Sequence, residues 1–138
     1  MGDSRTSSGV LLRFDEPSAS RSVVLEDDGR VAYAYLLDEE AIVGDVWLYN
    51  VAETPDSVDW KDQSKMPFLN PRSLCKSEDV PRLDPNSSIF CRWSKSGVEI
   101  AIDGVLMARL KHGAKPGWSR LALRAGPLAK PLESGAGE

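Results

Sequence analysis

The dipeptide Asp103-Gly104 constrains the fold of this chain more than any other feature of the sequence. It separates the run 98–102, in which large apolar residues fall on every second position, from the run Val105-Leu106-Met107-Ala108-Arg109. Asp-Gly between alternating runs is a strong signal of a β-hairpin, because a type I′ turn requires positive φ at both central residues. The predicted pairs are Ile102 with Val105 and Ile100 with Met107.

The preceding run, Ile89–Trp93, alternates in the same way, and Ser96-Gly97 supplies a two-residue turn between the two runs. The predicted pairs are Trp93 with Ile100 and Cys91 with Ile102. Two independent turns therefore place the same apolar face inward. Residues 88–110 predict a three-stranded meander with Trp93 in its core.

The N-terminal half also consists of short strand-like segments separated by turns. Its strand-like segments are Val10–Phe14, Ser22–Glu26, Arg30–Leu37 and Ile42–Asn50. Asp27-Asp28-Gly29 is the turn between the second and third segments, whereas the loop near residues 38–41 leaves the register open. A four-residue loop pairs Tyr35 with Gly44 and Tyr33 with Val46, and a three-residue loop places Tyr33, Tyr35, Val43 and Trp47 on one face. One residue of slip turns every side chain to the other face of the sheet.

Five prolines exclude a central strand across most of residues 51–87, because proline lacks the N–H that a β-ladder needs. Trp60 and neighbouring apolar residues indicate an ordered excursion. We expect one β-domain over residues 10–126, with mobile tails at 1–9 and 127–138. The predicted fold is all-β, an antiparallel β-sandwich or partly open barrel of about seven or eight short, hairpin-connected strands.

Charge and the absence of targeting signals narrow the range of possible partners and locations. The net charge is −4 and the isoelectric point is 5.1, which argues against nucleic acid as a partner. Residues 1–69 carry a net charge of −8 and residues 70–138 carry +4, so the domain is dipolar if the halves occupy different faces. Scattered surface charge is the alternative. Without a signal peptide or transmembrane segment, the expectation is a soluble, cytoplasmic protein with no membrane partner.

Catalytic and metal-binding patterns are weak. Cys75 and Cys91 are not spaced as a zinc or redox motif, and they are expected to be free thiols. The single histidine, His112, lies beside a loop, and the segment 117–121 lacks the second glycine of a nucleophile elbow. Acidic pairs occur at predicted turns, where solvated carboxylates are common. The sequence therefore predicts neither catalytic residues, nor a metal, nor a cofactor.

Binding residues are the remaining candidates. A strand over 119–124 is expected to point Leu121 and Leu123 inward, which directs Trp118, Arg120 and Arg124 outward as interface anchors. Asp45 interrupts an apolar strand, so it either needs a buried polar partner or faces a ligand. The candidate ligand or interface residues are Trp118, Arg120, Arg124, Asp45, Trp47, Tyr49 and Trp60.

Three functions follow from these residues. The first is a non-catalytic interaction domain that binds a protein, which includes a second copy of the chain in a homodimer. The second is a small-ligand, sugar-like binding module with a pocket around Asp45, Trp47 and Tyr49. The third is a small hydrolase-type enzyme, which would need His112 close to a carboxylate.

Overall fold

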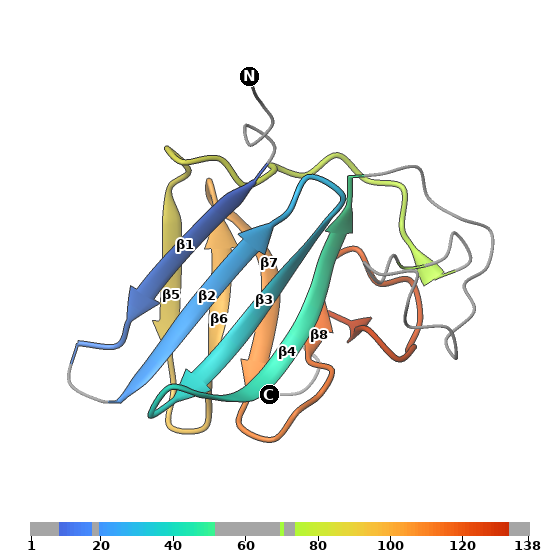
Figure 1. Ribbon diagram of the computed structural model, residues 1–138. Coiled ribbons are helices and arrows are strands. Elements are labelled where there is room, and N and C mark those ends of the chain that lie inside the picture. The colour runs from blue at the N-terminus through green and yellow to red at the C-terminus, as the bar shows by residue number, and fades with distance from the viewer. Residues whose placement is uncertain (1–8, 18–19, 52–69, 71–73, 133–138) are drawn as a thin grey trace.

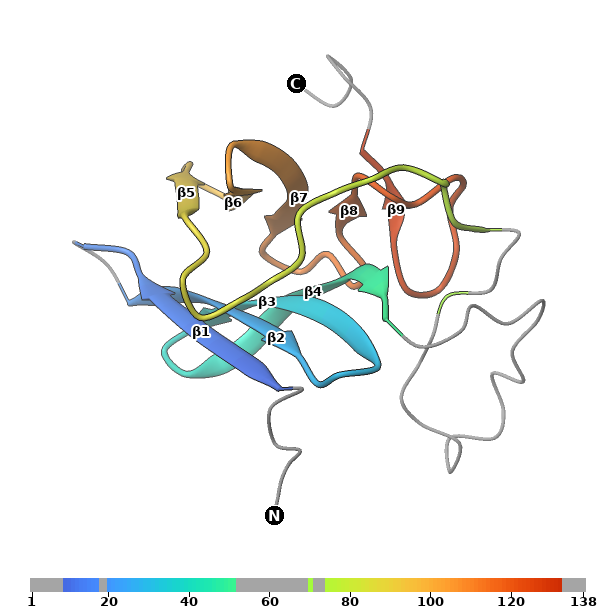
Figure 2. The same ribbon diagram turned by 90° about the horizontal axis from the view of Figure 1, so that it is seen from above.

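The protein is a sandwich of two β-sheets (Figures 1 and 2). The computed structural model describes residues 9–17, 20–51, 70 and 74–132. The first sheet, in spatial order, contains β1 (Val10–Asp15), β2 (Arg21–Asp27), β3 (Val31–Asp38) and β4 (Ala41–Asn50). The second contains β5 (Ile89–Trp93), β6 (Gly97–Ile102), β7 (Val105–Lys111), β8 (Trp118–Ser119) and β9 (Lys130–Pro131). The all-β prediction is confirmed, and the sheets do not close into a barrel.

The hairpins of the first sheet follow the sequence signals with one correction. Gly29 has φ of 90° in the predicted turn between β2 and β3. The β3–β4 loop contains two residues, Glu39 and Glu40, with φ of 51° and 68°, so both predicted loop lengths are wrong. Register shifts in the β3–β4 ladder then pair Tyr35 with Asp45 and Tyr33 with Trp47. Tyr33, Tyr35 and Trp47 consequently share one face, as the three-residue loop predicts.

The meander of the second sheet is confirmed, but both of its registers differ from the expectation. Trp93 pairs with Val98 rather than Ile100, because the turn begins at Ser94 and its N–H donates to the Gly97 carbonyl at 2.9 Å. A two-residue shift leaves the inward face unchanged. After the Asp103-Gly104 turn, Met107 forms a bulge. The resulting pairs are Ile102 with Val105, Ala101 with Leu106 and Ile100 with Ala108.

The core lies between the two sheets and is built from their facing side chains. Its fully buried members from the first sheet include Val23, Leu25 and Leu36. The second sheet contributes Ile100, Ile102, Met107 and Leu110. Trp93 is only half-buried at the edge of this cluster, so its predicted place in the core is partly correct.

The folded part extends beyond the predicted domain boundary. β9 and the buried Ala129 follow residue 126, so the predicted tail over 127–138 begins too early. Within residues 51–87, Cys75 forms an isolated antiparallel β-bridge with Ala122, and Leu83 is buried against the core. Trp60 lies outside the described residues. The part of the chain that the structure describes contains no helix able to cross a membrane.

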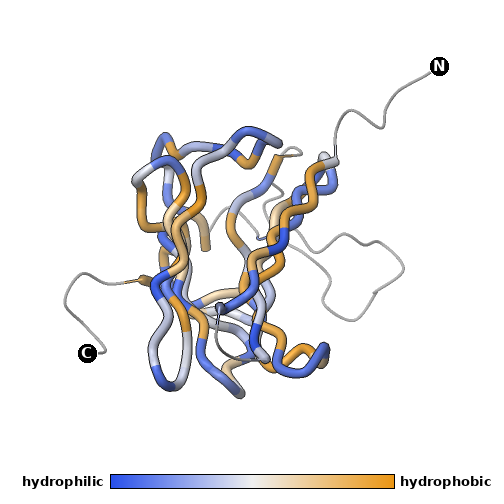
Figure 3. The backbone as a smooth tube through the Cα atoms, turned by 90° about the vertical axis from the view of Figure 1, so that its left-hand side faces the viewer, coloured by the Kyte–Doolittle hydropathy of each residue, from blue (hydrophilic) through white to orange (hydrophobic). Residues whose placement is uncertain are grey.

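The two lateral sides of the sandwich differ. The outer edge of β4 is covered by the β7–β8 loop and by a segment before β9. Four backbone hydrogen bonds link these elements: Gly113 N to Val43 O, Asp45 N to Ala114 O, Gly117 N to Asp45 O and Trp47 N to Leu128 O. On the other side, the edges of β1 and β5 form no backbone hydrogen bond with any described residue outside their own sheets. Figure 3 views the protein from this side.

Candidate functional site

A row of charged and aromatic residues crosses the outer face of the second sheet. Successive ladder pairs connect one residue from each of five neighbouring strands: Arg92, Glu99, Arg109, Trp118 and Lys130. Residues that lie opposite each other in a ladder project to the same face. Neighbouring strands are about 4.8 Å apart, so the row presents three cations, one carboxylate and one indole across the whole sheet.

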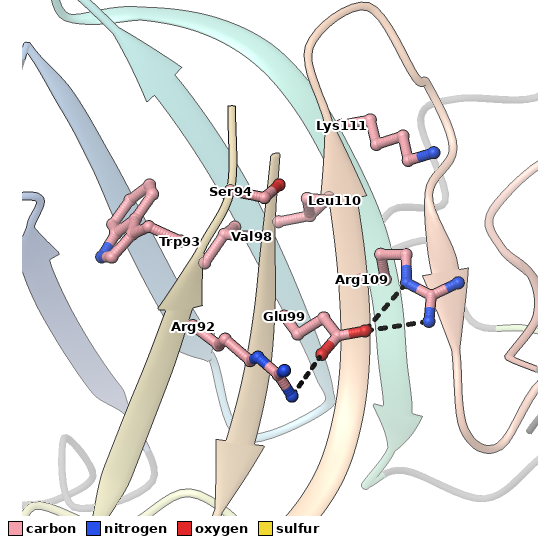
Figure 4. Close-up of a pocket in the computed structure, with 8 residues that line it drawn as sticks. All are labelled: Arg92, Trp93, Ser94, Val98, Glu99, Arg109, Leu110 and Lys111. Atoms are coloured by element: carbon pink, nitrogen blue, oxygen red, sulfur yellow. Dashed lines mark hydrogen bonds and ion pairs between the residues drawn. The ribbon is translucent and has the colours of Figure 1, made fainter. Parts of the chain in front are cut away.

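Glu99 is the anion at the centre of the basic part of the row. Its carboxylate accepts hydrogen bonds from Arg109 Nη2 at 2.9 Å and Nε at 3.2 Å, and Arg92 Nη1 lies 3.9 Å away (Figure 4). The Arg109 side chain is only 15% exposed, whereas that of Arg92 is 76% exposed. The first pair therefore fixes the orientation of Glu99, and Arg92 is held loosely enough to contact another molecule.

Trp118 lies between two lysines. Lys130 Nζ is 4.4 Å and Lys111 Nζ is 5.6 Å from the centre of the indole ring. Ammonium groups at such distances are attracted by the ring quadrupole. The half-buried indole thus positions two positive charges at the β9 end of the row.

A pocket of about 360 Å³ adjoins the other end of the row. Its lining residues are Arg92, Trp93, Ser94, Val98, Glu99, Arg109, Leu110 and Lys111 (Figure 4). Gly97 pairs with Lys111 beside it. A Cβ on Gly97 would lie 2.1 Å from the Leu110 carbonyl oxygen, so this strand position has to remain without a side chain. The pocket walls carry three cations and one carboxylate, a composition suited to an anionic group.

The segment after Trp118 departs from the predicted strand. β8 ends at Ser119, so alternation does not continue to residue 124. Leu121 is buried as expected, but Leu123 is 44% exposed, which reverses its predicted orientation, and Ala122 between them is fully buried. Arg120 Nε donates to Glu78 Oε2 at 2.8 Å. This hydrogen bond connects Arg120 to the segment 51–87, which contains Glu78. Arg124 is exposed and does not belong to the ladder row.

The predicted pocket around Asp45, Trp47 and Tyr49 is not assembled. Tyr49 faces the core side, where its hydroxyl donates to buried Asp27 at 2.7 Å and accepts the Leu83 N–H at 2.8 Å. Burial and the Asp27 hydrogen bond raise its pKa. Trp47 projects to the opposite face and is 1% exposed, with its indole N–H bonded to Asn50 Oδ1 at 2.8 Å. Both aromatic residues have structural partners.

The surroundings of the Asp45 side chain differ from those of Trp47 and Tyr49. Its carboxylate is half-buried opposite Tyr35, and burial raises its pKa, with Lys115 acting in the opposite direction. The Asp45 carboxylate forms no hydrogen bond with a described residue, whereas the Asp45 backbone takes part in covering the β4 edge. The side chain therefore weakens rather than strengthens the folded state at neutral pH.

The residues that a hydrolase-type enzyme would need are only partly brought together. His112 Nε2 lies 3.8 Å from Asp38 Oδ2, which is longer than the hydrogen bond of a catalytic pair. Ser20 donates to the same carboxylate at 2.7 Å, so the hydroxyl is bonded to the acid and not to the imidazole. Cys75 and Cys91 form no disulfide with each other, and burial raises the pKa of each thiol to about 11. Within the described ranges, acidic, histidine and cysteine side chains form no group that could hold a metal.

Comparisons with protein families, curated proteins and solved structures find no match to this chain. The site therefore has to be interpreted from its own chemistry.

Sequence reasoning found Trp118 but missed most of the row. Glu99 and Arg109 are ten positions apart and meet only because the Met107 bulge shifts the β6–β7 register by one residue. Arg92 meets Glu99 because the two-residue turn after β5 lies at Lys95-Ser96, one residue earlier than the predicted Ser96-Gly97. The sequence signal for this row was the excess of basic residues after position 70, but that excess does not show which residues pair across the sheet.

Proposed function

We propose that this chain is a non-catalytic binding domain whose basic outer face holds an acidic segment of another protein. The row from Arg92 to Lys130 is the observation that carries the proposal. Its cations are matched by a single carboxylate within the row, which leaves a net positive charge on the face. The exposed Arg92 and the lysines around Trp118 are able to contact carboxylates of a partner, and Trp and Arg are typical anchors of protein interfaces.

The distribution of charge supports an acidic partner. Residues 9–51, which form the first sheet, carry nine acidic and three basic side chains, a net charge of −6. Residues 88–132, which form the second sheet, carry two acidic and eight basic side chains, a net charge of +6. The two halves of the sequence therefore form oppositely charged layers. Such a field steers an acidic partner toward the second sheet.

The same features favour a protein over a nucleic acid. Glu99 interrupts the positive row, and a carboxylate in this position repels a continuous phosphate backbone. An acidic peptide can place its carboxylates beside the arginines and its apolar side chains beside Trp118. We propose the cytoplasm as the location, because Cys75 and Cys91 form no disulfide with each other, as is usual in a reducing compartment.

A direct test uses a fluorescein-labelled octaglutamate peptide and measures its anisotropy as the full chain is added. Lys130→Glu reverses a charge in the row, and Lys115→Glu makes the same change in the exposed β7–β8 loop. We expect Lys130→Glu to weaken binding about tenfold, which corresponds to ~1.4 kcal/mol, and Lys115→Glu to change it much less. Trp118→Ala should also weaken binding, because the two lysines lose the ring that positions them.

Three results would contradict the proposal. One is equal weakening by both charge reversals, which would show a general effect of net charge. Another is the absence of saturable peptide binding at low salt. The third is tighter binding of a labelled single-stranded oligonucleotide of the same length, which would assign the face to nucleic acid instead.

A further inference from the structure

The two most exposed large apolar side chains in the described part of the chain lie on the two open edge strands. Leu11 on β1 is 68% exposed and Phe90 on β5 is 64% exposed. Neither strand forms a bulge with its neighbour, and neither contains proline or lysine. Bulges, prolines and lysines are the usual devices that prevent edge-to-edge pairing. Here the ladder bulges occur between β3 and β4 and between β6 and β7 instead.

The two edges also lie on the same side of the sandwich. Figures 1 and 2 show β1 and β5 at this side in different layers, with their arrows in a similar direction. Arg21, on the strand next to β1, holds the end of β5: its guanidinium lies 5.2 Å from the centre of the Trp93 ring, and Nη2 donates to the Ser94 carbonyl at 2.7 Å. The C-terminal ends of the two strands are therefore neighbours.

We propose that these edges bind a second copy of the chain, with β1 antiparallel to β1 of the partner and β5 antiparallel to β5 of the partner. A two-fold axis perpendicular to the layers, passing near Leu12 and Cys91, generates both pairings in one operation. The product is a dimer in which two four-stranded sheets join into one and the two five-stranded sheets join likewise. A single extended peptide would cover only one of the two edges, which is why we favour a second copy as the occupant.

The side chains are compatible with this arrangement. Both strands contain an exposed apolar residue followed two positions later by arginine: Leu11 and Arg13 in β1, and Phe90 and Arg92 in β5. Antiparallel pairing centred on the intervening residue places each apolar side chain opposite the partner's arginine. The arginine stem then covers the leucine, and the guanidinium contacts the phenylalanine ring. A register centred on either arginine would oppose like charges, which destabilises a strand pair.

Sedimentation velocity of the full chain over micromolar to submillimolar concentrations tests the proposal. We expect a reversible monomer–dimer equilibrium for the wild type. The double variant Leu11→Lys with Phe90→Lys should raise the dissociation constant by about thirtyfold or more, the effect expected for central contact residues. Ile42→Lys is the matched control, since Ile42 is 49% exposed but lies on the covered β4 strand. All three side chains are exposed, so thermal denaturation should show folded variants.

A cross-link reports the register. In a Cys75→Ser background, the predicted pairing places Cys91 opposite Cys91 of the partner, with Cα atoms about 4.5–5.5 Å apart. This separation suits a disulfide, and mild oxidation should yield a covalent dimer that is lost in the double lysine variant. A strictly monomeric wild type would refute the proposal. So would a dimer that the double variant leaves intact, or one in which oxidation of Cys91 gives no cross-link.

Discussion

The two lateral sides of the sandwich solve the problem of an exposed sheet edge in different ways. On the β4 side, the chain's own loop satisfies the outward backbone groups, and Gly117 lies at the centre of this contact. Its N–H donates to the Asp45 carbonyl at 2.7 Å, and its own carbonyl accepts the Lys130 N–H at 2.9 Å. On the β1 and β5 side, side chains rather than backbone groups connect the two sheets. The contrast shows that a short sandwich can close one edge internally and leave the other without backbone partners among the described residues.

The open side depends largely on one arginine. Arg21 contacts Trp93 and donates to the carbonyls of Ser94 and Lys95 in the second sheet. It also forms two 2.8 Å hydrogen bonds with the Glu16 carboxylate. Both side chains of this ion pair are largely covered, at 13% and 15% exposed. Glu16 therefore orients the guanidinium that ties the layers together, a role that charge pairs on an open surface rarely have.

The largest effect is expected from closing the space at Gly117. A Cβ at this position would lie 2.6 Å from the Arg109 carbonyl oxygen and 3.1 Å from Leu110 Cδ2. Gly117→Ala should therefore force the loop away from β4 and reduce the free energy of unfolding by about 1–3 kcal/mol. Gly9→Ala on the open side is the control, because its Cβ would meet only the Asp27 carbonyl at 3.9 Å. Urea denaturation of both variants measures the difference, and equal stabilities would contradict our account of the closed side.

The sequence predicted the fold well because its signals are local. Alternation and turn residues identify β1 to β7, and the Asp103-Gly104 pair identifies one hairpin turn directly. The same information could not give the register beyond a bulge. Met107 is apolar and fits the alternation as well as its neighbours do, so no local signal marks it as the position of the bulge. β8 and β9 are two residues long, which is too short for any periodic pattern.

The candidate site was only partly predictable for the same reason. Trp118 stood out as an aromatic residue among arginines, but Lys130, its partner across the parallel β8–β9 pair, lies in a segment expected to be a tail. Composition showed that the second half is basic. It did not show that the two halves form separate layers, because that depends on the topology. Tyr49 illustrates the opposite error, since an aromatic residue that suggested a ligand is bonded to Asp27 in the core.

A smaller effect on stability is expected from the ion pair between Glu16 and Arg21 on the open side. Arg21 holds the pKa of Glu16 below its usual value, chiefly through the side-chain hydrogen bond. The ionised carboxylate thus stabilises the folded state above the unfolded pKa of 4.5, and this contribution disappears as the pH falls through the folded pKa. Glu16→Gln should cost about 0.5–1 kcal/mol at pH 7. The difference from the wild type should vanish in strongly acidic solution.

Thermal denaturation from pH 7 to pH 2.5 measures this profile, with Glu26→Gln, an exposed carboxylate on β2, as the matched control. A Glu16→Gln deficit that stays constant across the whole pH range would mean that packing, rather than charge, accounts for it. If sedimentation shows the proposed dimer for the wild type, its loss in Glu16→Gln would additionally show that the contact between the layers supports the open edge.

The smallest effect is expected from Asp45 on the closed side, and its sign is opposite. Burial raises the pKa of this carboxyl above 3.8, so its ionised form is disfavoured in the folded protein. The folded state is therefore relatively more stable below the unfolded pKa, and this advantage is lost as the pH rises through the folded pKa. Asp45→Asn removes the charge and keeps the shape and the backbone hydrogen bonds of the β4 edge. It should raise the free energy of unfolding at pH 7 by no more than about 0.5 kcal/mol, because the side chain is only half-buried. At pH 2.5 the two proteins should be equally stable. Destabilisation by Asp45→Asn at pH 7 would instead show that the carboxylate has a favourable partner, and the closed side would then depend on a charge as the open side does.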